Sequence, residues 1–108
     1  FGGTPTKLLD TISYNTSKGA LMTFTKDLAV KLAPYNIQVN AIAPGFFPTK
    51  MTEKVLKDMN KTIVRNIPAG RFGNEEDLRG AALFLSTKAS DYVTGHVLVV
   101  DGGITALV

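Results

Sequence analysis

Apolar residues recur at three- and four-residue spacing in the first third of the chain, at Leu21, Phe24, Leu28 and Leu32. This periodicity predicts a long helix over about residues 13–32, with one buried apolar stripe and an end near Pro34. Residues 1–10 contain two glycines and a proline, so we expect a loop there.

Two short segments have the pattern of strands. Residues 37–43 alternate between apolar and polar side chains at their start and include β-branched residues, and the turn pair Pro44-Gly45 ends the predicted strand. Residues 96–100 are apolar enough for a buried strand, and the turn over residues 101–103 closes it. Between the strands we predict a short helix over about residues 52–59 and a second one up to residue 65. Asn74 is a good N-cap, followed by three acidic residues, for a further helix running to about residue 86.

The order of these elements is helix, strand, helices and strand, which favours a parallel sheet covered by helices. Two strands do not make such a sheet alone, so we expect its other strands to precede residue 1. The alternative is self-association through the strand edges. The 108 residues, 44% hydrophobic and 19% charged, have globular composition and suffice for one domain at most.

The composition excludes several kinds of site. The chain has no cysteine, which removes disulfides, thiolate metal ligands and cysteine nucleophiles. The one histidine, His96, has no ligand cluster around it in sequence, so we expect no metal. No apolar run is long enough for a membrane span, and no signal-peptide pattern is present. A net charge of +3 is compatible with anionic partners, but no nucleic-acid motif is found.

The clearest candidate chemistry is the pair Tyr14 and Lys18, four residues apart in the predicted helix and so on one face. A phenol ordinarily has a pKa near 10, and a neighbouring ammonium favours its ionised form. The pair therefore suits proton transfer. Taken alone, a Tyr and a Lys at this spacing are common, and a structural role is the competing interpretation.

Further motifs follow this pair in order along the chain. They are Tyr14-Asn15-Thr16-Ser17-Lys18-Gly19-Ala20, Val39-Asn40-Ala41-Ile42-Ala43-Pro44-Gly45, Thr49, Arg71-Phe72-Gly73, Asp77-Leu78, Thr94-Gly95 and Val100-Asp101-Gly102-Gly103. The ordered series resembles the C-terminal half of the short-chain dehydrogenase/reductase family. The resemblance implies an α/β fold, the C-terminal part of a Rossmann-type doubly wound parallel sheet. It also implies that residues 1–108 are the C-terminal portion of a single domain whose nucleotide-binding half is absent.

The resemblance also assigns roles to individual residues. Tyr14 would be the general acid and base at the substrate carbonyl, and Lys18 would assist it and bind the nicotinamide ribose. The cofactor would be NADP or NAD. Further cofactor-binding residues would line the nicotinamide, namely Pro44, Gly45, Phe47 and Thr49. At Gly45 the absent Cβ would let the backbone approach a flat ring. A turn that merely ends a strand is the competing interpretation of Pro44-Gly45.

The family's catalytic serine has no counterpart at the commonest spacing, where this chain has Phe1. Ser13 adjoins Tyr14 but points elsewhere on the predicted helix, and Ser17 is expected to pack near the cofactor, so neither replaces it. The segment over residues 4–12 is longer than usual for the family, so we expect the serine just before residue 1. The isolated 108 residues are therefore expected to be inactive.

The implied activity is a cytoplasmic NAD(P)-dependent oxidoreductase acting on a small carbonyl or alcohol substrate, in a homo-oligomer that is a tetramer by resemblance. Residues 43–51 are similar to 3-oxoacyl-carrier-protein reductases, which we favour, and to gluconate 5-dehydrogenase-like enzymes. Lysines on the segment after the Pro44-Gly45 turn form a basic stripe suited to an acidic carrier protein, or simply a solvated face, at Lys50, Lys54, Lys57 and Lys61. A third alternative is a non-catalytic piece that self-associates and binds no cofactor.

Overall fold

The structure is a computed structural model, and it describes residues 5–45, 47–48 and 61–107, with side chains from residue 16 onward. The chain divides into two compact units. The first comprises Phe1–Ala41 and Asp91–Val97, and the second comprises Ile42–Ser90 and Leu98–Val108. Each unit is described by itself below.

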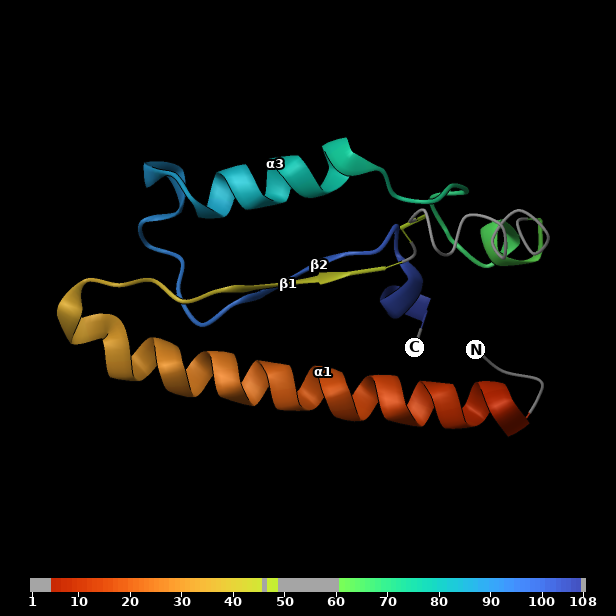
Figure 1. Ribbon diagram of the computed structural model, residues 1–108, viewed down its shortest axis with the longest axis horizontal. Helices are drawn as coiled ribbons and strands as arrows, with labels where there is room; N and C mark the ends of the chain where they lie inside the picture. The colour runs from red at the N-terminus through yellow and green to blue at the C-terminus, as the bar shows by residue number, and fades with distance from the viewer. Residues whose placement is uncertain (1–4, 46, 49–60, 108) are drawn as a thin grey trace. The chain divides into compact units, whose positions relative to one another are not determined.

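The first unit is dominated by the helix α1, Pro5–Leu32, the long red-to-orange ribbon in Figure 1. The helix begins earlier than predicted: residues 5–10 were predicted to be a loop, whereas Pro5 is the first residue of α1. Proline fits the first turn, where its missing N–H has no partner in any case. No glycine or proline follows until Gly19. The predicted end is confirmed, since a 3₁₀ turn over Ala33–Tyr35 follows and Asn36 adopts a left-handed conformation with φ 59°.

The packed face of α1 includes most of the predicted stripe, since Leu21, Leu28 and Leu32 are half-buried there. Among residues 16–32 the fully buried positions of this face are Thr25 and Ala29, at 2% exposure each. Gly95 packs against this face: a Cβ added at Gly95 would lie 3.5 Å from the Cβ of Ala29. Phe24, predicted to be buried, is 64% exposed. Small residues form this contact because the backbone at Gly95, rather than a large side chain, packs against the helix.

The first strand is shorter than predicted, because the side chain of Asn40 replaces part of the backbone ladder. Its Nδ2 donates to the carbonyl of Val93 (2.9 Å), and its Oδ1 accepts from the N–H of His96 (3.0 Å). Regular pairing begins one residue later, where the N–H of Ala41 donates to the carbonyl of His96 (2.9 Å). Residues 37–40 therefore lie outside the strand, which had been predicted to start at residue 37.

The strands β1, Ala41–Pro44, and β2, Val97–Val100, form a two-stranded sheet and lie side by side in Figure 1. Hydrogen bonds run from Ala41 to His96 and from Gly45 to Val100, so both strands advance by four residues in the same direction. The pairing is therefore parallel, as the sequence predicts. Both carboxyl ends lie at the same edge of the sheet.

The second unit contains the helix α3, Glu75–Leu85, as predicted from its cap. Asn74 and Asp77 form a reciprocal capping box, in which each side chain accepts from the other residue's N–H. Residues 61–65 are also helical, as predicted. The helix predicted over residues 52–59 lies outside the described residues, as do three members of the lysine stripe, Lys50, Lys54 and Lys57.

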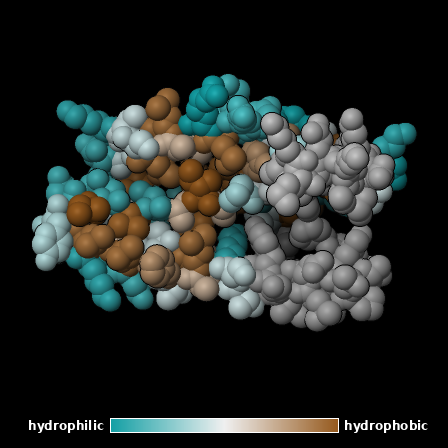
Figure 2. Space-filling model, viewed as in Figure 1, coloured by the Kyte–Doolittle hydropathy of each residue, from teal (hydrophilic) through white to brown (hydrophobic). Residues whose placement is uncertain are grey.

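The described residues bury little apolar surface among themselves. Of the residues described with side chains, only Ala29 and Ile67 are buried apolar residues, whereas several large apolar side chains are exposed, including Val30 at 75% and Leu83 at 63%. Figure 2 shows hydrophobic residues at the surface in this view. Within the described part of the chain, no helix is long and apolar enough to cross a membrane. The same residues contain no group of metal-ligating side chains.

Candidate functional site

The pair Tyr14 and Lys18 lies within one continuous helix, α1. Four residues advance an α-helix by slightly more than one turn, so the two positions share a face. Lys18 is half-buried rather than fully solvated. The helical spacing on which the proposed chemistry depends is therefore present in the structure.

The turn after β1 holds the second group of candidate residues. The N–H of Gly45 donates to the carbonyl of Val100 (2.9 Å), which carries the ladder to the end of both strands. A Cβ at Gly45 would lie 2.7 Å from the Cβ and 2.8 Å from the Cα of Asp101. The structure thus gives a reason for glycine here that the sequence did not: the two strand ends approach too closely for a side chain. The predicted cofactor residue Thr49 lies outside the described residues.

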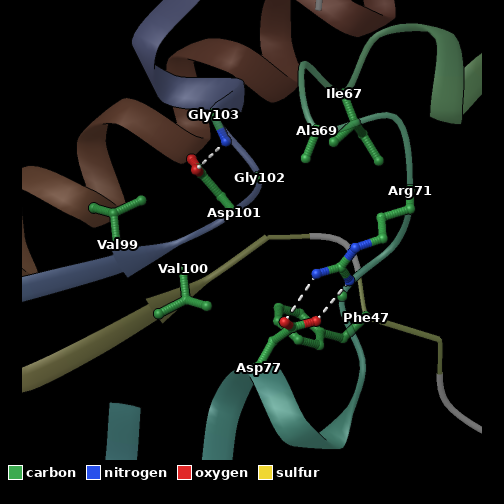
Figure 3. Close-up of a pocket in the computed structure, with 11 residues that line it drawn as sticks. Phe47, Ile67, Ala69, Arg71, Asp77, Val99, Val100, Asp101, Gly102 and Gly103 are labelled. Atoms are coloured by element: carbon green, nitrogen blue, oxygen red, sulfur yellow. Dashed lines mark hydrogen bonds and ion pairs between the residues drawn. The ribbon is translucent and has the colours of Figure 1, made fainter. Parts of the chain in front are cut away.

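A pocket of about 320 Å³ lies in the second unit, at the carboxyl ends of the two strands. Its walls combine apolar side chains with a few charged groups, and Figure 3 shows them converging from β2, the 67–73 loop and the start of α3. Phe47, a predicted cofactor-binding residue, lines this pocket. In open α/β sheets the carboxyl edge is where ligands bind, and the volume suits a small ligand.

One ion pair forms part of the pocket wall. The Arg71 guanidinium donates to both carboxylate oxygens of Asp77, at 2.8 and 3.0 Å. Arg71 thus pairs with one of the three acidic residues that open α3. The hydrogen bonds from Arg71, with a further one from the N–H of Asn74, lower the pKa of Asp77 to about 2. The same pairing raises the pKa of Arg71.

The turn after β2 closes the other side of the pocket. The carboxylate of Asp101 accepts from the N–H of Gly103 and from the N–H of Thr105, both at 2.9 Å. Gly102 and Gly103 have φ of 65° and 98°, a backbone region that other residues rarely adopt. The predicted tight turn is therefore confirmed, and its carboxylate holds the turn together.

The sequence did not predict the contact that Gly73 makes in the pocket. A Cβ at this position would lie 2.7 Å from Cδ2 of Phe47 and closer still to Cε2 and Cζ of the same ring. The two residues are far apart in the chain, and no periodicity or motif spacing relates them. The Arg71-Phe72-Gly73 motif marks the position without indicating what it contacts.

The candidate residues fall into two groups. Tyr14 and Lys18 belong to the first unit, whereas Gly45 and Phe47 belong to the second. Within each group the structure brings the predicted residues together, on one helix and in one turn.

Comparison with known proteins extends this picture. A family model described as Enoyl-(Acyl carrier protein) reductase matches residues 7–105. A 5-keto-D-gluconate 5-reductase of Escherichia coli (strain K12) is 50% identical over 102 residues, which cover 92% of this chain and 40% of the relative. A 3-oxoacyl-[acyl-carrier-protein] reductase of Aquifex aeolicus is 43% identical over 93 residues, covering 86% of this chain and 38% of the relative.

A solved structure is similar in both sequence and shape. The gluconate 5-dehydrogenase from Burkholderia cenocepacia J2315, in complex with NADP and tartrate, is 41% identical and gives a TM-score of 0.77. The match covers 88% of this chain and 38% of that one. The α/β fold class predicted from the sequence is thereby confirmed. The chain spans about 40% of the length of the curated relatives it matches.

Proposed function

The chain belongs to the short-chain dehydrogenase/reductase family, and from that membership we propose that it is the C-terminal portion of one NAD(P)-dependent oxidoreductase domain. The observation that carries the proposal is the Tyr14–Lys18 pair on one face of α1, within the matched residues 7–105. The share of the relatives' length that the chain covers, about 40%, supports its being one portion of a domain. In the following, the parent protein means the complete domain.

The residues present fit a nicotinamide cofactor by their chemistry. Lys18, a half-buried residue, supplies an ammonium group that can donate to the hydroxyl groups of a ribose. Gly45 lies at the carboxyl edge of a parallel sheet, the edge at which such folds bind dinucleotides. The similar Burkholderia structure contains NADP, which supports this cofactor without deciding between NADP and NAD.

The catalytic step assigned to this chain is a proton transfer at the phenolic oxygen of Tyr14. When the cofactor is bound, its reduced nicotinamide is the source of a hydride for the carbonyl carbon. Tyr14 donates its proton to the carbonyl oxygen, which completes the alcohol, and Lys18 stabilises the phenolate that remains. Solvent then returns a proton to Tyr14. In the oxidative direction the same phenolate accepts the proton of the alcohol.

The turn after β1 would hold the nicotinamide ring in place. Pro44 and Gly45 would contact the ring, while the backbone of Phe47 and the side chain of Thr49 would bind its carboxamide. The serine that polarises the substrate carbonyl would come from the part of the parent protein that precedes this chain. For that reason the 108 residues alone are expected to be inactive.

For the substrate we propose a keto derivative of a sugar acid. The E. coli relative named as a 5-keto-D-gluconate 5-reductase is 50% identical, against 43% for the 3-oxoacyl-carrier-protein reductase that the sequence analysis favoured. The latter remains the second candidate, supported by that relative and by the basic residues after the β1 turn. A tetrameric assembly and a cytoplasmic location remain predictions by resemblance.

The test is an assay of the parent protein with both reduced nicotinamides and two substrates, 5-keto-D-gluconate and a 3-oxoacyl thioester. We expect the absorbance of the reduced cofactor to fall with the sugar acid and to fall much more slowly with the thioester. The opposite ratio would replace the first substrate by the second. Oxidation of neither cofactor with either substrate would contradict both assignments.

A further inference from the structure

Gly73 is a glycine for a steric reason rather than a conformational one. Among the described residues the glycines with positive φ are Gly70, Gly95, Gly102 and Gly103, so the backbone of Gly73 would accept alanine. The space is what excludes a side chain. A Cβ at Gly73 would overlap the end of the Phe47 ring, with Cδ2 at 2.7 Å and two further ring atoms closer. The bare backbone of Gly73 is therefore the surface on which this ring rests.

The surface is held rigidly on both sides. Before Gly73, the Arg71 guanidinium is fixed by Asp77 and by the carbonyl of Phe72 at 2.9 Å. After Gly73, Asn74 is fixed by the capping box to the same Asp77. The backbone of Gly73 therefore cannot move away from an added methyl group without straining a charged pair or a helix cap, so the Phe47 ring would have to move instead. Figure 3 shows Phe47, Arg71 and Asp77 grouped on this side of the pocket.

The other end of the turn is held as well. Two residues before Phe47, the N–H of Gly45 donates to the carbonyl of Val100, and Asp101 lies so close that a Cβ at Gly45 would overlap it. Gly45 is thus held by the sheet, and Phe47 is held by the contact of its ring with Gly73. Under the proposed function, the backbone of Phe47 binds the carboxamide of the nicotinamide.

We infer that Gly73 is a positioning residue: it seats the ring of Phe47 and thereby places the backbone that binds the nicotinamide. This inference rests on the proposed function. A methyl group at position 73 would displace the ring and pull the turn with it. Because the effect passes through Phe47, it should vanish when the ring is absent.

The experiment is a double-mutant cycle in the parent protein with Gly73→Ala, Phe47→Ala and the double variant. Each is titrated with the reduced cofactor that the unmodified protein binds and with the matching ADP-ribose, which lacks nicotinamide. We expect Gly73→Ala to weaken binding of the reduced cofactor about 10-fold, a typical coupling for residues in contact. Binding of the ADP-ribose should change by less than about 2-fold. In the Phe47→Ala background, adding Gly73→Ala should also change reduced-cofactor binding by less than about 2-fold.

Gly80→Ala is the matched control, because a Cβ at this exposed glycine of α3 meets nothing within 4 Å. It should leave both affinities unchanged. The inference would be overturned if Gly73→Ala weakened the binding of both ligands equally, or if it weakened cofactor binding just as much in the Phe47→Ala background. Either result would indicate general destabilisation. Unchanged affinities would overturn it too. If the unmodified protein binds no reduced nicotinamide, the proposed function itself fails. If Gly73→Ala alone does not fold, a soluble, folded double variant supports the seating of the ring, and an unfolded double variant contradicts it.

Discussion

The replacement Gly45→Ala tests how closely the ends of β1 and β2 approach. In the structure the added Cβ would lie 2.7 Å from the Cβ of Asp101 and 2.8 Å from its Cα. Carbon atoms in contact rest at about 3.5–4.0 Å, so the strand ends would have to separate by about 1 Å. One of the two opposing atoms is backbone, which a change of rotamer does not move. The separation would stretch the hydrogen bond from Gly45 to Val100.

The expected cost follows from these two effects. Overpacking by one methyl group against a rigid neighbour costs about 1–3 kcal/mol. Weakening one backbone hydrogen bond adds about 0.5–1.5 kcal/mol. The free energy of unfolding should therefore fall by about 1.5–4.5 kcal/mol, which lowers the Tm of a domain of 150–250 residues by about 3–18 °C.

The assay is thermal and urea unfolding of the parent protein followed by circular dichroism, with Gly80→Ala as the control. Gly80 is a helical glycine with open space around it, so alanine should raise stability by up to about 1 kcal/mol through helix propensity. A Gly45→Ala variant that unfolds at the same temperature as the unmodified protein would refute the close approach. It would leave contact with the nicotinamide as the reason for glycine at this position.

Two further substitutions test the units separately. The pKa of Asp77 is lowered from 3.8 to about 2, so its carboxylate stabilises the fold above pH 4 and loses that contribution as the pH falls toward 2. Asp77→Asn should lower the urea midpoint at neutral pH, and its deficit should shrink between pH 4 and 2; a deficit independent of pH would contradict the ion pair. Asn40→Ala removes the bonds to Val93 and His96, and should cost about 1–3 kcal/mol in urea unfolding. A loss below about 0.5 kcal/mol would show that water replaces both bonds.

Local chemistry made part of the fold predictable. Asn74 followed by three acidic residues predicted α3 to within a residue, since an N-cap and the helix dipole act over one turn. The ion pair of Arg71 with Asp77 is likewise local, because the two residues are only six positions apart. The four-residue spacing of Tyr14 and Lys18 required only that the helix be continuous.

Contacts between distant segments were not predictable in the same way. The side chain of Asn40 displaced the start of β1 by bonding to residues more than fifty positions away. Phe24 has the helical spacing of a core residue, yet the face of α1 that is packed is the one bearing Thr25 and Ala29. The contact of Gly73 with Phe47 likewise depends on where a distant turn lies. Periodicity reports which face is apolar, and the fold decides what covers it.

The central claim is that Tyr14 supplies the proton in a nicotinamide-dependent reduction. Its most direct test is Tyr14→Phe in the parent protein, measured by single-turnover oxidation of bound reduced cofactor with 5-keto-D-gluconate, with cofactor affinity measured in parallel. Removing a general acid typically slows the chemical step about 10²–10⁴-fold. We predict a loss of this size with cofactor affinity unchanged within about 2-fold. A Tyr14→Phe protein that oxidises the cofactor at the unmodified rate would contradict the account.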